Sequence, residues 1–253
     1  MNKKPYIERA VIEINGGCNY TCQMCPQTDP GRHQGFLKKM SLEAFEDAVA
    51  QSTALGAKVI NLEGSGEPTL ERKLPKFIEI VKKYNAKSFI FSNGYRFKDQ
   101  YMKDCIDAGL NRIRFSVIGY DRETYKKWMN IDGFNLIKSN AANALEYAKS
   151  SGSDCIISSY HLITDNSKTD WEVEQYRKNF IDEIGLDAEI WKMHNWSGVY
   201  ENPNERIGNR KTCGRPFAPE ITIRAGGLDG KKSAVHPCCQ VLGRDEEAVL
   251  GHL

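Results

Sequence analysis

Three cysteines near the start of the chain have the clearest potential for chemistry. Cys18, Cys22 and Cys25 stand in the run 16–26 with the spacing Cys-x3-Cys-x2-Cys. Three thiolates on one short loop can ligate three irons of a cubane [4Fe–4S] cluster, which usually takes four cysteines. The fourth iron would stay open, and an open metal position is typical of a catalytic site. The spacing therefore predicts a cluster with one free iron.

Two other interpretations of these thiols are a structural zinc site and an ordinary loop. Structural zinc sites usually combine two Cys-x2-Cys pairs, and the sequence offers no second pair. An apolar run at residues 8–14 precedes the loop. The thiols are therefore expected at the C-terminal end of a strand, where α/β folds place their sites.

The cysteine loop resembles the signature of the radical S-adenosylmethionine (radical SAM) superfamily. In that superfamily the free iron chelates S-adenosylmethionine (SAM), and the reduced cluster cleaves SAM to a 5′-deoxyadenosyl radical that abstracts hydrogen from the substrate. The resemblance implies a [4Fe–4S] cluster with an open iron site, SAM, and an electron donor such as flavodoxin or ferredoxin. The residue before the third cysteine, commonly aromatic in the family and close to the adenine, is Met24 here. Methionine is apolar and adaptable enough to fill the same space.

Short polar motifs follow the next predicted strands. Gly66 and Glu67 lie in the run 64–68, after the second strand candidate. Glycine lets backbone approach a ligand closely, and a carboxylate accepts a charge-assisted hydrogen bond from an ammonium. The resemblance assigns both residues to the SAM amino group, whereas the alternative is a simple turn with a helix-initiating acid.

The third and fourth strand candidates also end in polar residues. Ser92 and Asn93 follow the third, and Ser116 ends the fourth. The resemblance implies that Ser92 and Asn93 contact the SAM carboxylate or ribose and that Ser116 binds the ribose. An ordinary Asn-Gly turn is the alternative for Asn93.

The composition is that of an ordinary globular protein, with 253 residues, 40% hydrophobic and 27% charged. A net charge of +2 argues against a nucleic-acid-binding surface, and no apolar run approaches a membrane span. Residues 1–6 lack the apolar core of a secretion signal. We expect a cytoplasmic protein without nucleic-acid or membrane partners, in which Cys105 and Cys155 are buried small hydrophobes.

Alternation of apolar runs with helical patterns predicts an α/β fold with a parallel sheet. Strand candidates lie at 8–14, 57–62, 87–92, 111–117, 154–160 and 187–193, and helix candidates at 41–54, 71–84, 98–108, 133–150 and 170–184. Six strands would not close an eight-stranded barrel. The resemblance implies a partial (βα)6 TIM-like barrel, with the radical SAM domain at 1–195, a linker at 196–212 and a small extension at 213–253.

The extension holds three further cysteines: Cys213, Cys238 and Cys239. Strand candidates at 220–224 and 233–236 flank a glycine-rich turn, which predicts a β-hairpin bracketed by thiols. The segment resembles the SPASM or twitch extension, which implies that these cysteines ligate an auxiliary [4Fe–4S] cluster. Vicinal thiols in a hairpin are the alternative. Relatives take further ligands from downstream cysteines and none follows here, so we interpret the sequence as a C-terminally truncated fragment.

The favoured function is a radical SAM enzyme that oxidises or otherwise modifies a small polar or carbohydrate-like metabolite. The alternatives are a peptide or protein side-chain maturase of the SPASM type, and a non-catalytic iron–sulfur or zinc protein. The non-catalytic alternative gives no reason for Glu67 and Asn93 to occur at successive strand ends. A nucleic-acid-associated metal module is the weakest alternative because the charge is nearly balanced.

Overall fold

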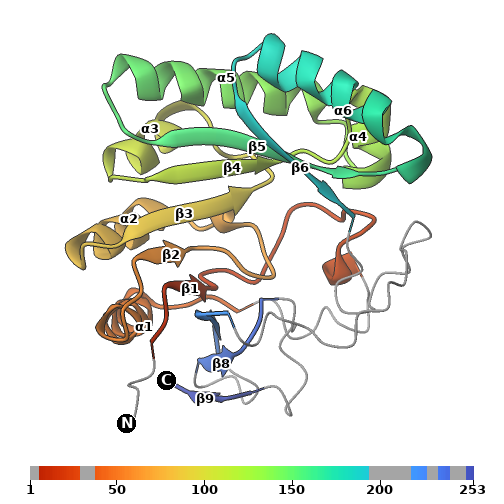
Figure 1. The fold of residues 1–253 in the computed structure, drawn as a ribbon. Coiled ribbons are helices and arrows are strands. Elements are labelled where there is room, and N and C mark those ends of the chain that lie inside the picture. Colours follow the sequence, from red (N-terminus) through yellow and green to blue (C-terminus); the bar gives the residue numbers. More distant parts are fainter. Residues whose placement is uncertain (1–5, 29–37, 194–217, 227–232, 240–248) are drawn as a thin grey trace.

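A computed structural model describes residues 6–28, 38–193, 218–226, 233–239 and 249–253. Its centre is a curved nine-stranded sheet in the order β6-β5-β4-β3-β2-β1-β7-β8-β9, with the helices packed along one side (Figure 1). The strands are β1 (Arg9–Ile12), β2 (Val59–Asn61), β3 (Lys87–Ser92), β4 (Arg112–Ser116), β5 (Ile156–Ile163), β6 (Asp187–Lys192), β7 (Glu220–Arg224), β8 (Ala234–His236) and β9 (Gly251–His252). Strands β1 to β6 are parallel neighbours. The predicted α/β fold with a six-stranded partial barrel is confirmed.

Six α-helices lie in the described part of the chain, between β1 and β6. They are α1 (Leu42–Ala54), α2 (Leu74–Lys83), α3 (Asp99–Asp107), α4 (Arg122–Met129), α5 (Phe134–Ser150) and α6 (Thr169–Arg177). The candidates at 41–54, 71–84, 98–108 and 133–150 are confirmed to within a few residues. The candidate at 170–184 is divided, because α6 passes into a π-helical turn at Lys178–Asp182. No helix among these described residues is both long and apolar enough to cross a membrane.

Two elements differ from the sequence prediction. Helix α4 was not predicted, because its eight residues are mostly polar and only Tyr125, Trp128 and Met129 are buried. Strand β5 extends to Ile163, three residues beyond the predicted end. The buried polar residue His161 interrupts the apolar pattern in the second half of this strand. Its Nε2 atom lies within hydrogen-bonding distance of Glu172 Oε1 of α6, at 2.7 Å.

The predicted hairpin is present and continues the barrel sheet. Strand β7 pairs in parallel with β1, and β8 pairs antiparallel with β7, with Ile223 opposite Val235. The predicted linker at 196–212 and Cys213 lie outside the described residues. The division into a domain at 1–195 and an extension at 213–253 stays a prediction.

Alternation along the strands separates a core face from an open face. In β4, Ile113 and Phe115 are fully buried beneath the helices, whereas Arg112, Arg114 and Ser116 point to the concave face. Because side chains alternate with a period of two, the same pattern recurs in the neighbouring strands. The concave face therefore presents polar side chains to a common space, together with apolar ones such as Val11, Phe89 and Phe91.

Candidate active site

A cavity of about 890 Å³ occupies the concave face of the sheet. Cys18, Cys22 and Cys25 line it from the loop after β1. All six residues expected to bind SAM line the same cavity: Met24, Gly66, Glu67, Ser92, Asn93 and Ser116. Cys239 also lines it, whereas Cys238 is buried in the hairpin. The structure thus brings together the cysteines and the polar strand ends that the sequence singled out, while their roles toward SAM stay predictions.

Backbone contacts hold the cysteine loop against the loop after β2. The Glu67 amide donates to the Gly17 carbonyl at 2.9 Å, and the Asn15 side chain donates to the carbonyls of Gly17 and Glu67 at 2.8 and 2.9 Å. A Cβ at Gly66 would lie 2.4 Å from the carbonyl oxygens of Asn15 and Gly17. Gly66 is therefore needed for this close packing of the two loops, and Asn15 is a supporting residue that the motif search missed.

The Glu67 carboxylate joins the loops after β2 and β3. Its Oε1 accepts from the Thr69 amide, the Thr69 hydroxyl and the Ser92 hydroxyl, at 2.9, 2.6 and 2.7 Å. Its Oε2 accepts from the Asn93 amide at 2.7 Å. Burial raises the pKa of Glu67, and these four donors act in the opposite direction. Oε2, with one donor, keeps the capacity to accept a second.

Asn93 extends this network to the cysteine loop. Its Nδ2 donates to Asn19 Oδ1 at 2.9 Å and lies 3.9 Å from Cys18 Sγ. The Tyr20 amide also points to Cys18 Sγ, at 3.4 Å. Donors directed at a sulfur stabilise a thiolate or a thiolate-bound metal. The loops after β1 and β3 are therefore arranged to support a ligating Cys18.

Helix α4 supports the other side of the cysteine loop. The Gln23 amide donates to the Trp128 carbonyl at 2.8 Å, and Cys22 Sγ lies 3.8 Å from Met129 Sδ. These contacts come from the last turn of the helix that sequence reasoning missed. Its N-cap, Asp121, which accepts from the Thr124 amide, was a local signal for this helix.

Burial keeps the three thiols neutral unless a cation binds them. Desolvation raises the pKa of each, that of Cys18 to about 12, and the Glu67 charge adds to the effect at Cys18. Thiols in such surroundings ionise when bound iron supplies positive charge. Among the described residues no three Cys, His, Asp or Glu side chains converge on a single ion position. A cubane needs no such convergence, because each thiolate binds its own iron.

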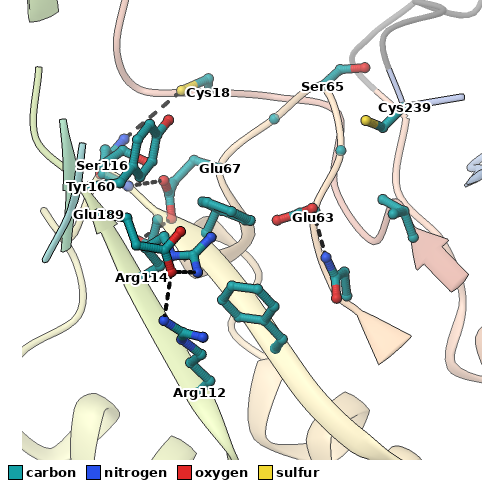
Figure 2. Close-up of a pocket in the computed structure, with 18 of the residues that line it drawn as sticks. Cys18, Glu63, Ser65, Glu67, Arg112, Arg114, Ser116, Tyr160, Glu189 and Cys239 are labelled. Atoms are coloured by element: carbon teal, nitrogen blue, oxygen red, sulfur yellow. Dashed lines mark hydrogen bonds and ion pairs between the residues drawn. The ribbon is translucent and has the colours of Figure 1, made fainter. Parts of the chain in front are cut away.

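A second polar group lies on the part of the cavity wall away from Cys18 (Figure 2). Arg114 and Arg112 both pair with Glu189, Arg112 at 2.9 Å. The Arg114 guanidinium carbon lies 4.8 Å from the ring centre of Phe91 and 5.2 Å from that of Trp191. The Arg114 side chain is only 7% exposed. Sequence reasoning missed this group, although the alternation Arg-Ile-Arg-Phe-Ser in β4 was a visible signal.

Glu63, two residues after β2, is a further cavity residue that the sequence did not single out. Its Oε1 accepts from Asn61 Nδ2 at 3.0 Å, whereas its Oε2 is buried and has no hydrogen-bond partner among the described residues. Burial raises the pKa of Glu63 from 4.5 to about 7. Nearby charges have smaller effects: Glu220 raises this pKa, and Arg114 and Arg9 lower it.

The free energy of unfolding is expected to depend on pH through Glu63. Between pH 4.5 and 7 the folded protein keeps a proton that the unfolded chain releases, so stability falls as pH rises through this window. Glu63→Gln removes the effect. In urea unfolding, the free energy of unfolding of the variant minus that of the parent should increase by about 1–3 kcal/mol from pH 4 to pH 8. A stability difference between variant and parent that stays constant with pH would contradict the assignment.

A buried ion pair ties the hairpin to the barrel. Arg224 of β7 donates to Glu13 Oε2 at 2.9 Å, to Ser65 Oγ at 2.7 Å and to the Cys239 carbonyl at 2.9 Å. Both charged side chains are buried, with 6% of the Arg224 side chain and 5% of the Glu13 side chain exposed. Arg224 therefore connects the hairpin cysteine to the loop that follows β2.

Arg224→Ala is expected to lower the free energy of unfolding by about 3–5 kcal/mol, because it leaves the Glu13 carboxylate buried without its cation. Chemical denaturation measures this. Lys83→Ala, which removes the exposed ion pair with Glu46, is the matched control and should change stability little. If both substitutions lower the free energy of unfolding equally, the buried ion pair contributes no more to stability than the exposed one.

The fold and the cavity define a partial α/β-barrel protein with a three-cysteine site at the end of its first strand. The model of the Radical SAM superfamily matches residues 12–178, about two thirds of the sequence. The chain therefore belongs to the radical SAM superfamily, as the resemblance of its cysteine loop implied. Membership implies a [4Fe–4S] cluster and SAM.

Curated relatives carry one recurring name. The chain is 30% identical over 138 residues to a probable GTP 3′,8-cyclase of Thermococcus kodakarensis, covering 54% of this chain and 43% of the relative. It is 30% identical over 183 residues to a probable GTP 3′,8-cyclase of Sulfolobus acidocaldarius, covering 71% of this chain and 55% of the relative. The matches thus span about half the length of these relatives.

Solved structures share the fold at low identity. The Streptococcus suis protein SuiB, bound to its precursor peptide SuiA, aligns with a TM-score of 0.73 and 12% identity, over 96% of this chain and 62% of SuiB. BtrN, in complex with AdoMet and 2-DOIA, aligns with a TM-score of 0.60 and 16% identity, over 100% of this chain and 79% of BtrN. At these identities the likeness concerns the fold alone.

Proposed function

We propose that this chain carries the catalytic core of an enzyme that removes a hydrogen atom from a small polar substrate with the help of SAM. The observation that carries the proposal is the single cavity shared by the cysteine loop, the predicted SAM-binding residues and the charged group around Arg114. In this assignment Cys18, Cys22 and Cys25 hold the cluster. The cluster and SAM would together supply a 5′-deoxyadenosyl radical.

The residues around the cysteines would bind and orient SAM. Glu67 Oε2 would accept from the ammonium, while its bonds to Ser92 and Asn93 fix its position. Ser116 would contact the ribose, and Met24, which is 7% exposed, would pack against the adenine. The proposal includes a protein electron donor such as flavodoxin or ferredoxin, and a cytoplasmic location.

The substrate is proposed to be a small polar metabolite, carbohydrate-like in its density of polar groups. A cavity of about 890 Å³ matches the size of small-molecule sites, and its wall offers both donors and acceptors. A nucleotide is the second candidate, because the relatives are named as probable GTP 3′,8-cyclases. An oxidation or another radical modification would be the outcome in either case.

The proposal is tested by 5′-deoxyadenosine formation in anaerobically reconstituted protein with a chemical reductant. Sugars, nucleotides including GTP, and peptides are added separately. We expect SAM cleavage without added substrate and faster cleavage with a small polar compound. Stimulation by peptides alone would favour a side-chain maturase, and no SAM cleavage under any condition would contradict the proposal.

An auxiliary cluster bound by Cys213 with Cys238 or Cys239 belongs to the same proposal. Cys239 lines the cavity, so a cluster there would lie beside the substrate. Iron analysis should find more than about four irons per chain after reconstitution. Replacing all three cysteines by alanine should bring the count to about four. If the parent protein holds only about four irons and the triple variant holds the same number, the proposed auxiliary cluster is wrong.

A further inference from the structure

The charged side chains that line the cavity are mostly neutralised by one another. The pairs are Arg9–Glu220 at 3.6 Å, Arg112–Glu189, Arg114–Glu189 and Arg224–Glu13. Lys87 and Asp154 also line the cavity but are exposed, whereas Glu63 is partly buried and, in the part of the chain that the structure describes, hydrogen-bonds to the neutral Asn61. Figure 2 shows the Glu63 carboxyl group directed into the space shared with Arg114.

Four polar atoms of residues that line the cavity are buried without a hydrogen-bond partner among the described residues: Asn61 Oδ1, Glu63 Oε2, Arg114 Nε and Thr222 Oγ1. Glu63 Oε2, an acceptor, and Arg114 Nε, a donor, are the two that belong to charged side chains. Buried polar groups in native proteins are almost always hydrogen-bonded, so an orphan pair beside a cavity indicates a ligand that completes it. Such a ligand must offer a donor to Glu63 and an acceptor to Arg114.

We propose that Glu63 is a substrate-binding residue and that the substrate is a small hydroxylated amine, which places a primary ammonium against Glu63. A hydroxyl donor would satisfy the Oε2 atom but bring no positive charge, while Arg114, the cation of the same wall, is paired with Glu189. An ammonium satisfies the atom and also stabilises the ionised carboxylate, which burial disfavours in the free protein. A substrate oxygen would accept from Arg114 Nε, and Phe91 and Trp191 would contact the carbon skeleton. This inference rests on the proposed function, whose substrate class it narrows.

The test compares amines with their hydroxyl counterparts. D-glucosamine and D-glucose, serinol and glycerol, and 2-aminoethanol and ethylene glycol are titrated by calorimetry into reconstituted, SAM-loaded protein. We expect the amine of at least one pair to bind at least tenfold more tightly than its partner. Glu63→Gln keeps the size and an acceptor oxygen but removes the charge. It should weaken amine binding by about 10- to 150-fold, the range for a charged hydrogen bond, and change hydroxyl binding by less than about twofold.

Asp154→Asn is the matched control. Asp154 also lines the cavity but is exposed, so its loss should leave amine binding within about twofold, because exposed charges interact weakly. The inference is overturned if no amine binds better than its partner, if Glu63→Gln binds amines as the parent does, or if Asp154→Asn weakens them equally. SAM binding by the parent, measured in the same way, tests the proposed function separately, because the inference can fail while SAM still binds.

Discussion

Cys22→Ala is expected to abolish 5′-deoxyadenosine formation, because it removes a thiolate ligand of the cluster. Cys22 lies between the other two cysteines of the loop and packs against Met129 of α4. Alanine leaves two thiolates for three iron positions, so the cluster cannot be held with its open iron intact. Liquid chromatography of the nucleoside product measures the change.

Cys155→Ala is the control for Cys22→Ala. Cys155 is buried, as predicted, and lies outside the cavity lining. Burial raises the pKa of its thiol to about 12, so it stays a neutral apolar side chain. This variant should retain the parent rate of SAM cleavage. If the Cys22→Ala protein still forms 5′-deoxyadenosine at the parent rate, the cysteine loop is not required for SAM cleavage.

Glu67→Ala is expected to weaken SAM binding by about 10- to 150-fold, the value for a charged hydrogen bond. It should also lower the free energy of unfolding by about 1–3 kcal/mol, because the Ser92 hydroxyl and the Asn93 amide lose their acceptor. Calorimetric titration with SAM and thermal unfolding measure the two effects. Glu67→Gln, which keeps one acceptor oxygen, separates loss of charge from loss of structure.

Glu71→Ala is the control for Glu67→Ala. Glu71 is a buried carboxylate four residues further along, accepts from the Lys73 amide at 3.0 Å and does not line the cavity. Its removal should destabilise the protein without changing SAM affinity. If Glu67→Ala and Glu67→Gln both bind SAM as the parent does, Glu67 is a structural residue only.

The sequence predicted those parts of the site whose residues are close together along the chain. The spacing of Cys18, Cys22 and Cys25 and the polar ends of successive strands are local patterns. Parallel strands carry such ends to one edge of a sheet, so convergence of Glu67, Asn93 and the cysteine loop on one cavity could be expected before any coordinates.

The parts of the site that the sequence did not predict depend on contacts between residues that are far apart along the chain. Glu63 is distinguished by an Oε2 atom that has no hydrogen-bond partner among the described residues, which no local pattern records. Arg114 and Glu189 are 75 residues apart, and Arg224 meets Glu13 across 211 residues. Helix α4 was missed for a related reason: a short polar helix gains its stability from packing beneath the cysteine loop rather than from its own periodicity.

The electron paramagnetic resonance spectrum of the reduced, reconstituted protein, recorded before and after addition of SAM, will show whether the cysteine loop holds a cluster that binds SAM. If Cys18, Cys22 and Cys25 hold a [4Fe–4S] cluster with an open iron, SAM will bind that iron and change the spectrum, and Cys22→Ala will show no such change. A parent spectrum that is identical with and without SAM would contradict the account.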